Sequence, residues 1–369
     1  MRGILVQSLV SRGVPFEVAL ETATRVRERI VEQGEVEPDE LRKLVDELLP
    51  AEYELEPPPR RSLGLDPPRV KSQRGTSTPF SKGILSVSLQ GAGLDPTDAY
   101  QVSQELETRL LQSGATEIGR AALRDLVADT IERSHGSRAV ARYRVWRATF
   151  EDPKPLFVLL GGSSGAGKTT VAVEVARRLE ISRVIGTDSI RQIMRLMFSN
   201  DLMPEIHCST YDAYQILERD PGGQSDFKAR LLAGYREQAQ KIAVGVQALL
   251  DRALEENASM LIEGANLLPG TFDLDRYRDR AHVIFIVMAS LDPEQYRAHF
   301  TTRAVREQLR APDRYLPHFD AILTIQDHIL AQAELYELPI IDNVQLDETI
   351  LAVVRSVIGT LKKSAQASP

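Results

Sequence analysis

The residues best suited to chemistry in this sequence lie in a glycine-rich stretch. Residues 162–169 read GSSGAGKT, between an apolar run at 156–160 and a helical pattern at 171–179. In a strand–loop–helix arrangement of this kind, glycines let backbone N–H groups turn toward phosphate oxygens, and the new helix adds its positive N-terminal end. We therefore predict that the loop binds the phosphates of ATP; a glycine- and serine-rich loop that binds nothing is the alternative.

The spacing of this loop also predicts a role for each residue type. Lys168 is placed to contact the β- and γ-phosphates and to act in catalysis, and the hydroxyl of Thr169 is placed to bind Mg²⁺. The predicted ATP-binding residues are Gly162, Ser163, Ser164, Gly165, Ala166, Gly167, Lys168, Thr169 and Thr170. The loop indicates the phosphoryl donor and leaves the acceptor open.

Two carboxylates follow other apolar runs. Asp188 comes two residues after the run at 184–186, and Glu263 directly follows the run at 260–262. Because ligands bind at the carboxyl ends of parallel strands, Asp188 is a candidate to accept a proton from an attacking hydroxyl, to contact the acceptor or to hold Mg²⁺. Glu263 is a candidate to orient Mg²⁺ through water or to bind the acceptor. The alternatives are a helix N-cap for Asp188 and a charge at the following turn for Glu263.

Basic residues are needed locally if this acidic chain binds an anionic acceptor. Arg191 and Arg195 lie four residues apart after Asp188, so a helix there would present both on one face. Arginine binds phosphate and carboxylate groups through two parallel hydrogen bonds, and we predict that the pair contacts the acceptor. A solvated helix face explains the same spacing.

A second basic cluster occupies residues 299–315, which read HFTTRAVREQLRAPDRY. Its arginines recur every three or four residues and have few acidic neighbours, which favours a lid that closes over the reacting phosphoryl group. The alternative is a surface helix paired with acids. The residues are Arg303, Arg306 and Arg310, predicted to be catalytic, and Arg314, predicted to bind substrate.

The elements that position these residues are short apolar strands alternating with helical segments. The predicted strands are residues 156–160, 184–186, 260–262, 283–288 and 339–341. This order predicts an α/β fold with a five-stranded parallel sheet covered by helices on both faces, in the arrangement of a P-loop kinase. The loop after 339–341 is expected beside the nucleotide base.

The region before residue 150 contains an internal repeat. Residues 2–13 read RGILVQSLVSRG and residues 82–93 read KGILSVSLQGAG, and matches continue at an offset of 80 residues. Each copy predicts three helices, and seven prolines mark residues 50–79 as a stiff linker whose end, at 69–72, could form a strand. The predicted domains are a truncated helical repeat at 1–49, a linker at 50–68, an all-α domain at 69–150 and the kinase domain at 151–369. An accidental match between helical bundles is the alternative.

Composition limits the partners. The net charge of −7 disfavours nucleic acid, and no apolar stretch approaches the roughly 20 residues that cross a bilayer. Cys208 is the single cysteine, which excludes an internal disulfide and a multi-cysteine zinc site and favours the reducing cytoplasm. We expect a small phosphorylated molecule as the partner, no membrane, and an oligomeric state that is open, with a homo-oligomer possible.

Several motifs together resemble the archaeal-type 2-phosphoglycerate kinase family over about residues 69–345. They are PFSKGIL at 79–85, GGSSGAGKTT at 161–170, TDSIRQIMR at 187–195, IEGANLLPG at 262–270, HFTTR at 299–303, IQDHIL at 325–330 and PIIDN at 339–343. The resemblance implies an ATP-cone-like helical domain before the kinase domain. It also implies phosphorylation of 2-phosphoglycerate to 2,3-bisphosphoglycerate, with ATP and Mg²⁺ as cofactors.

The sequence departs from the family pattern on the acceptor side. Asn266 stands where the family pattern has histidine, Thr324 stands where it has arginine, and residues 205–208 read EIHC in place of a TLHE-like run. Two alternatives therefore stay open. One is a kinase for another phosphorylated polyol or acid, and the other is a nucleotide-sensing regulator with little turnover. A nucleic-acid-directed protein is disfavoured by the charge and by the lack of cysteines for a zinc ribbon.

Overall fold

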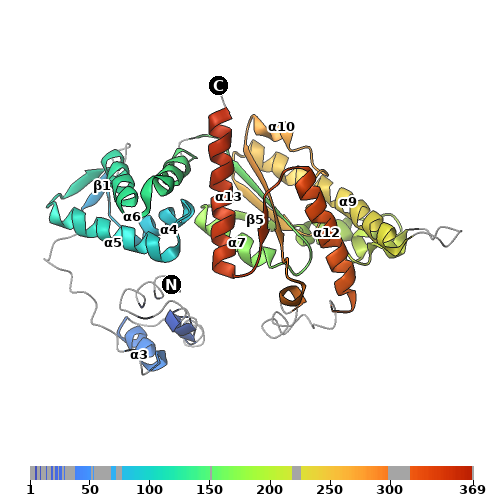
Figure 1. The fold of residues 1–369 in the computed structure, drawn as a ribbon, viewed down its shortest axis with the longest axis horizontal. Helices are drawn as coiled ribbons and strands as arrows, with labels where there is room; N and C mark the ends of the chain where they lie inside the picture. Colours follow the sequence, from blue (N-terminus) through green and yellow to red (C-terminus); the bar gives the residue numbers. More distant parts are fainter. Residues whose placement is uncertain are drawn as a thin grey trace. The chain divides into compact units, whose positions relative to one another are not determined.

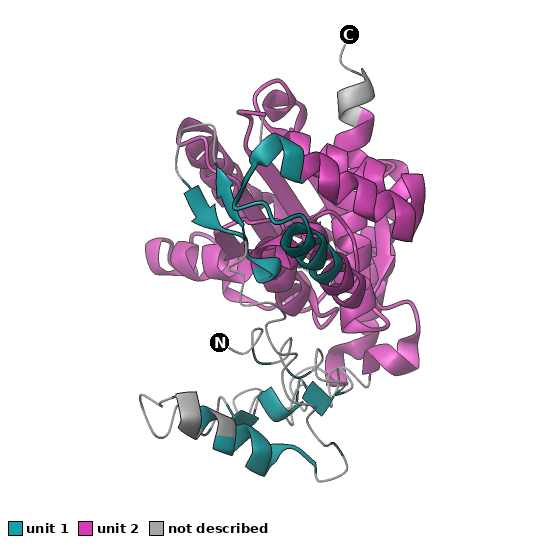
Figure 2. Ribbon diagram, turned by 90° about the vertical axis from the view of Figure 1, so that its left-hand side faces the viewer, with its two compact units in different colours: residues 1–83, 104–123 teal, residues 84–103, 124–369 magenta. Residues whose placement is uncertain are grey.

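The computed structural model describes residues 38–50, 53, 68–71, 77–149, 152–217, 226–297 and 316–367, together with isolated positions before residue 30. The chain separates into two compact units, which Figure 2 colours teal and magenta. One unit comprises residues 1–83 and 104–123, and the other comprises residues 84–103 and 124–369. The predicted domain boundaries at residues 49, 68 and 150 stay predictions.

The larger unit is built on a five-stranded parallel sheet. The strand order is β5 (Arg183–Gly186), β6 (Met260–Gly264), β4 (Leu156–Gly161), β7 (His282–Ala289) and β8 (Ile340–Asp342). Every neighbouring pair runs parallel. The central strand β4 is buried along its whole length, which explains why its sequence is a continuous apolar run rather than an alternating one. The predicted α/β fold with this sheet is confirmed.

Helices cover both faces of the sheet (Figure 1). On one face lie α7 (Lys168–Arg178) and α13 (Leu346–Ala367), which also contact each other. On the other face lie α8 (Thr187–Met197), α9 (Phe227–Glu255), α10 (Asp275–Arg278) and α12 (Phe319–Leu335). Fully buried side chains of the sheet and of these helices form the main core, including Phe157 and Leu159 of β4, Tyr235 of α9 and Ile325 of α12.

The register of the sheet brings three strand ends to one edge. Glu263 of β6 pairs with Leu160 of β4 on one side and with Gly186 of β5 on the other. Since all three strands point the same way, the glycine-rich loop after β4, the carboxylate of Glu263 and the start of α8 after β5 meet at this edge. Parallel open sheets bind their ligands at this position.

The region before the kinase sheet contains α4 (Lys82–Gly91), α5 (Pro96–Gln112) and α6 (Arg120–Thr149), as the repeat predicted for its second copy. It also contains a small sheet that the all-α description omits. Strand β1 (Arg69–Lys71) pairs antiparallel with β2 (Ser77–Pro79) and parallel with β3 (Glu117–Gly119). Only the strand at 69–72 had a sequence signal, because three-residue strands are too short to show alternation.

Most of the first repeat and most of the linker lie outside the described residues. Within the described part, α3 (Pro38–Leu48) contributes Val45 to a small apolar cluster that also contains Leu9, Val14, Ala19 and Val26. Among the helices that the structure describes, none is long and apolar enough to cross a bilayer.

Candidate active site

The glycine-rich loop after β4 has a backbone that only glycine accommodates at its ends. Gly162 has a φ of 144°, and a Cβ there would lie 2.2 Å from the carbonyl oxygen of Met288. Gly167 has a φ of 76°, and a Cβ there would lie 2.4 Å from Nδ2 of Asn343. Close packing against the neighbouring strand ends therefore fixes the loop in a tight curve, as phosphate binding by backbone N–H groups requires.

Lys168 and Asn343 each donate a hydrogen bond to a backbone carbonyl of this loop. The Lys168 side chain is buried, and its Nζ donates a hydrogen bond to the carbonyl oxygen of Ser163 at 2.7 Å. Asn343 follows β8, and its Nδ2 donates to the carbonyl oxygen of Ala166 at 3.0 Å. Asn343 belongs to the loop that was expected beside the nucleotide base, and here it supports the phosphate-binding loop itself.

Thr169 and Glu263 form the contact that can hold a metal ion. Thr169 Oγ1 donates to Glu263 Oε1 at 2.9 Å, and the Glu263 side chain is 8% exposed. Hydroxyl and carboxylate oxygens are the ligands that Mg²⁺ prefers, and Mg²⁺ in nucleotide sites takes one or two protein ligands and otherwise water and phosphate oxygens. Among the described residues, no group of three or more His, Cys, Asp or Glu side chains could hold a metal ion together.

Asp188 lies in the first turn of α8, where Gly186 is the N-cap and makes no side-chain cap bond. The Asp188 side chain is 77% exposed, and its Oδ1 accepts a hydrogen bond from Nη2 of Arg191 at 3.1 Å. Asp188 is therefore not the helix cap that its position after β5 also allowed. The described residues show no direct contact between Asp188 and Thr169, so the carboxylate joined to Thr169 is Glu263.

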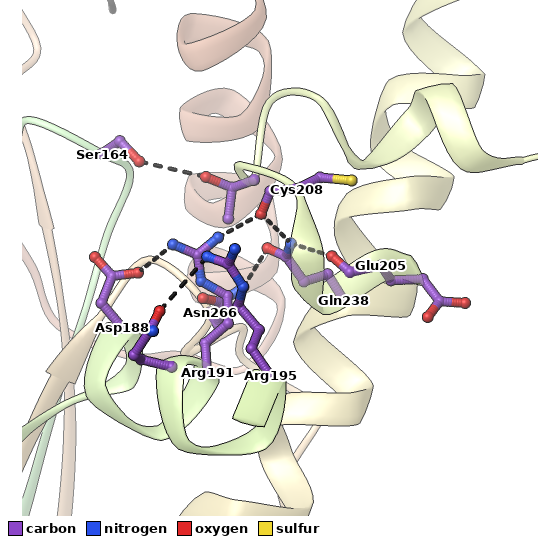
Figure 3. A network of polar contacts seen from close by, with 10 residues as sticks. Ser164, Asp188, Arg191, Arg195, Glu205, Cys208, Gln238 and Asn266 are labelled. Atoms are coloured by element: carbon purple, nitrogen blue, oxygen red, sulfur yellow. Dashed lines mark hydrogen bonds and ion pairs between the residues drawn. The ribbon is translucent and has the colours of Figure 1, made fainter. Parts of the chain in front are cut away.

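Arg191 continues this chain of contacts into the loop after α8 (Figure 3). Its Nη1 donates to the backbone carbonyl oxygen of Cys208, directly after the 3-10 turn η1 (Pro204–His207). Both Nη atoms of Arg191 are thus bonded within the chain. Arg195 differs: within the part of the chain that the structure describes, its hydrogen bond is a 3.5 Å contact to the side chain of Gln192, and the residue is exposed.

Gln238 of α9 ties the loop to the next strand end, as Figure 3 shows. Its Nε2 donates to the carbonyl oxygens of Glu205 at 2.6 Å and Cys208 at 3.1 Å, and its Oε1 accepts from Nδ2 of Asn266 at 2.9 Å. Gln238 and Asn266 are both buried. Asn266 follows β6, so one buried amide pair fixes the loop at 204–208 against the loop that follows Glu263.

Sequence reasoning missed Gln238 and recognised Asn266 only as a departure from the family pattern. Gln238 lies on the buried face of α9, in line with Leu231, Tyr235 and Ile242 at spacings of three or four residues. A polar residue in an apolar stripe of this kind is the signal that could have found it, because a buried amide needs hydrogen-bond partners. Tyr296 and Gln326, which contact the glycine-rich loop, were also missed.

The remaining predicted residues divide into two groups. Ser164 Oγ lies 3.4 Å from Thr210 Oγ1, which joins the glycine-rich loop to the loop after α8, and Thr170 is exposed in the first turn of α7. The arginines of the proposed lid, Arg303, Arg306, Arg310 and Arg314, lie outside the described residues. Their role stays a prediction.

Comparison with known proteins shows the family to which the chain belongs. The profile of the ATP cone domain matches residues 68–150, and that of the zeta toxin family matches residues 142–200. The 2-phosphoglycerate kinase of Methanocaldococcus jannaschii is 34% identical over 284 residues, which cover 77% of this chain and 89% of that protein. The 2-phosphoglycerate kinase of Pyrococcus furiosus is 35% identical over 280 residues, covering 76% and 89%. The chain belongs to the 2-phosphoglycerate kinase family.

Solved structures of small-molecule kinases also match. Shikimate kinase from Acinetobacter baumannii is 14% identical with a TM-score of 0.33, covering 60% of this chain and 99% of that one. A gluconokinase from Sinorhizobium meliloti 1021 is 14% identical with a TM-score of 0.30, covering 58% and 94%. Family membership and the geometry of the glycine-rich loop together make the chain a P-loop phosphotransferase that uses ATP and Mg²⁺.

Proposed function

We propose that this member of the 2-phosphoglycerate kinase family transfers the γ-phosphoryl group of ATP to the 3-hydroxyl of 2-phosphoglycerate, giving 2,3-bisphosphoglycerate and ADP. The observation that carries the proposal is the meeting of three strand ends at one edge of the sheet. They bring a phosphate-binding loop, the carboxylates of Glu263 and Asp188, and the arginines of α8 together. Relatives that carry the name 2-phosphoglycerate kinase match most of their own length.

The transfer step follows from these groups. The acceptor oxygen forms a bond to the γ-phosphorus, while the bond from that phosphorus to the β–γ bridging oxygen breaks and ADP leaves. Asp188 accepts the proton of the acceptor hydroxyl, and Lys168 stabilises the charge on the transferred group. Thr169 and Glu263 would hold Mg²⁺, which would supply positive charge to the phosphates of ATP.

Recognition of the acceptor rests on the two arginines of α8, in different ways. A guanidinium has five N–H donors, and Arg191 already uses both Nη atoms on Asp188 and on the Cys208 carbonyl. Among the described residues Arg195 makes one long bond, to Gln192, so its remaining donors can serve a bound anion. We assign Arg195 to an anionic group of 2-phosphoglycerate and Arg191 to the positioning of Asp188. The lid arginines at 303–314 are proposed to complete the site from the other side.

The proposed acceptor is a small molecule rather than a nucleic acid, because a net charge of −7 repels a polyanionic chain while local arginines still bind a small anion. We place the reaction in the cytoplasm, where ATP and a reduced Cys208 both occur. Cys208 is a free cysteine in the structure.

An assay of ADP release across four acceptors tests the proposal. The full chain is supplied with Mg²⁺ and ATP and, separately, with 2-phosphoglycerate, 3-phosphoglycerate, glycerate or inositol phosphates. We expect 2-phosphoglycerate to give the largest kcat/KM and a product with two phosphate esters. A larger kcat/KM for another acceptor would overturn the choice of substrate, and ATP binding without stimulation by any acceptor would favour the nucleotide-sensing role instead.

A further inference from the structure

A buried hydrogen-bond cluster lies directly behind the glycine-rich loop. The Ser163 side chain is fully buried, with its Oγ 2.5 Å from the hydroxyl of Tyr296 and 3.1 Å from Oε1 of Gln326. The Tyr296 hydroxyl also donates to the carbonyl oxygen of Ser164 at 2.5 Å. Tyr296 follows β7 and Gln326 lies on α12, so two elements distant in sequence hold the same two loop residues.

The orientation of the Gln326 amide is fixed by the backbone of Ser290. Its Oε1 accepts from the Ser290 N–H at 3.2 Å, and its Nε2 donates to the Ser290 carbonyl oxygen at 3.0 Å. Rotating the amide by 180° would oppose two donors and two acceptors. Gln326 therefore presents an acceptor, and not a donor, to Ser163.

The three contacts of this cluster have only two hydroxyl protons between them. Tyr296 and Ser163 each carry one, while Ser164 O and Gln326 Oε1 carry none. Two arrangements keep a proton in the 2.5 Å contact between the hydroxyls. In one, Ser163 donates to Tyr296 and Tyr296 donates to the Ser164 carbonyl. In the other, Tyr296 donates to Ser163, Ser163 donates to Gln326, and the Ser164 carbonyl loses the proton of Tyr296.

The Ser164 carbonyl matters because it belongs to the peptide group that carries the N–H of Gly165. In a trans peptide the C=O and the N–H point in opposite directions, so a bond that fixes one also aims the other. The Tyr296 hydroxyl holds the Ser164 carbonyl from the buried side of the loop. The N–H of Gly165 is therefore directed away from the buried cluster, toward the side on which a phosphate binds.

We propose that Tyr296 is a positioning residue for ATP binding: its hydroxyl holds the Ser164 carbonyl and thereby aims the N–H of Gly165 at the phosphates of ATP. Tyr296 is completely buried and acts through the loop rather than by touching the nucleotide. The Tyr296 hydroxyl is protonated at neutral pH at its ordinary pKa, and burial raises that pKa further.

If Tyr296 only stabilised the fold, its aromatic ring would be the important group rather than its hydroxyl. The Tyr296 ring packs edge-on against Phe319 with centroids 5.6 Å apart. Tyr296→Phe keeps this ring and removes the donor. Tyr277→Phe is a matched control, since Tyr277 is equally buried, packs on Phe157, and donates its hydroxyl to Asp251 at 2.7 Å.

The test is the Kd for Mg·ATP, measured by calorimetry on the full-length variants without any acceptor. This measurement is independent of which acceptor the enzyme uses, so its failure is distinct from a failure of the proposed function. We expect Tyr296→Phe to weaken ATP binding about tenfold, the loss of one well-placed hydrogen bond, and to leave the KM for the acceptor unchanged at saturating ATP. Tyr277→Phe should lower Tm and leave the Kd for ATP unchanged.

Ser163→Ala supplies a second comparison. It removes the competing acceptor for the Tyr296 proton and keeps the bond from Tyr296 to the Ser164 carbonyl, so ATP binding should weaken less than in Tyr296→Phe. The proposal is overturned if Tyr296→Phe binds ATP as the wild type does, or if it lowers Tm alone, as Tyr277→Phe does. A greater loss of ATP affinity in Ser163→Ala than in Tyr296→Phe would also overturn it, because the serine hydroxyl would then be the important group.

Discussion

The two sides of the candidate site, one for the phosphoryl donor ATP and one proposed for the acceptor, differ in which chemical groups form them. The donor side is backbone held in place: Gly162 and Gly167 have no room for a side chain, and Ser163 and Lys168 are buried. The proposed acceptor side consists of side chains on α8 and on the loop that follows it. There Asp188 is 77% exposed and Arg195 is exposed. We therefore expect substitutions on the proposed acceptor side to leave the binding of ATP largely unchanged.

Among the described residues, two side-chain hydrogen bonds link the glycine-rich loop and the start of α7 to the end of β6 and to the loop after α8. Thr169 contacts Glu263, and Ser164 contacts Thr210 at the longer distance of 3.4 Å. The acceptor side has its own support, since Gln238 and Asn266 form a buried link that involves no residue of the glycine-rich loop. This separation predicts that most substitutions will affect the KM of one substrate and not that of the other.

Lys168→Ala is expected to have the largest effect and to act on the donor side. The loss of a charge that stabilises the transferred phosphoryl group lowers kcat/KM by about 10²–10³-fold. The measurement is ADP release at varied ATP. Lys241→Ala is the matched control, because Lys241 pairs with Glu237 on the exposed side of α9 at 3.3 Å and should leave kcat/KM unchanged. Equal activities of the two variants would contradict the assignment of Lys168.

The donor side was also the part that the sequence predicted best. The phosphate-binding loop requires glycines with positive φ, a lysine and a threonine at fixed spacing. These requirements are local, so the stretch GSSGAGKT predicts the structure of the loop. The apolar runs likewise predicted the five strands. The contact of Thr169 with Glu263 depends on the register of β4 and β6, which the sequence does not contain. Gln238 and Tyr296 contact the loops from residues 30 to 133 positions away, where no local pattern marks them.

Arg195→Ala tests the acceptor side with a smaller expected effect. A hydrogen bond to a charged group contributes about 1.5–3 kcal/mol, so the KM for the acceptor should rise about 10- to 100-fold, with the KM for ATP unchanged. Arg191→Ala should instead lower kcat, because it releases Asp188 and the Cys208 carbonyl. Steady-state kinetics at varied acceptor and varied ATP separate the two patterns. An increase in the KM for ATP in Arg195→Ala would contradict the proposed separation of the donor side from the acceptor side.

Gln238→Met should give the smallest kinetic effect and the clearest effect on stability. Methionine fills a similar volume but leaves the carbonyls of Glu205 and Cys208 with fewer donors and the amide of Asn266 without its acceptor. An unsatisfied buried polar group costs about 1–3 kcal/mol, so urea unfolding should show a loss of about that size. The loop at 204–208 also contacts Arg191 through the Cys208 carbonyl. The KM for the acceptor should therefore rise only a few-fold, by about 3-fold for each 0.7 kcal/mol of acceptor binding energy that is lost. If Gln238→Met instead weakened ATP binding as strongly as acceptor binding, the buried amide pair would have to be regarded as a support shared by both sides.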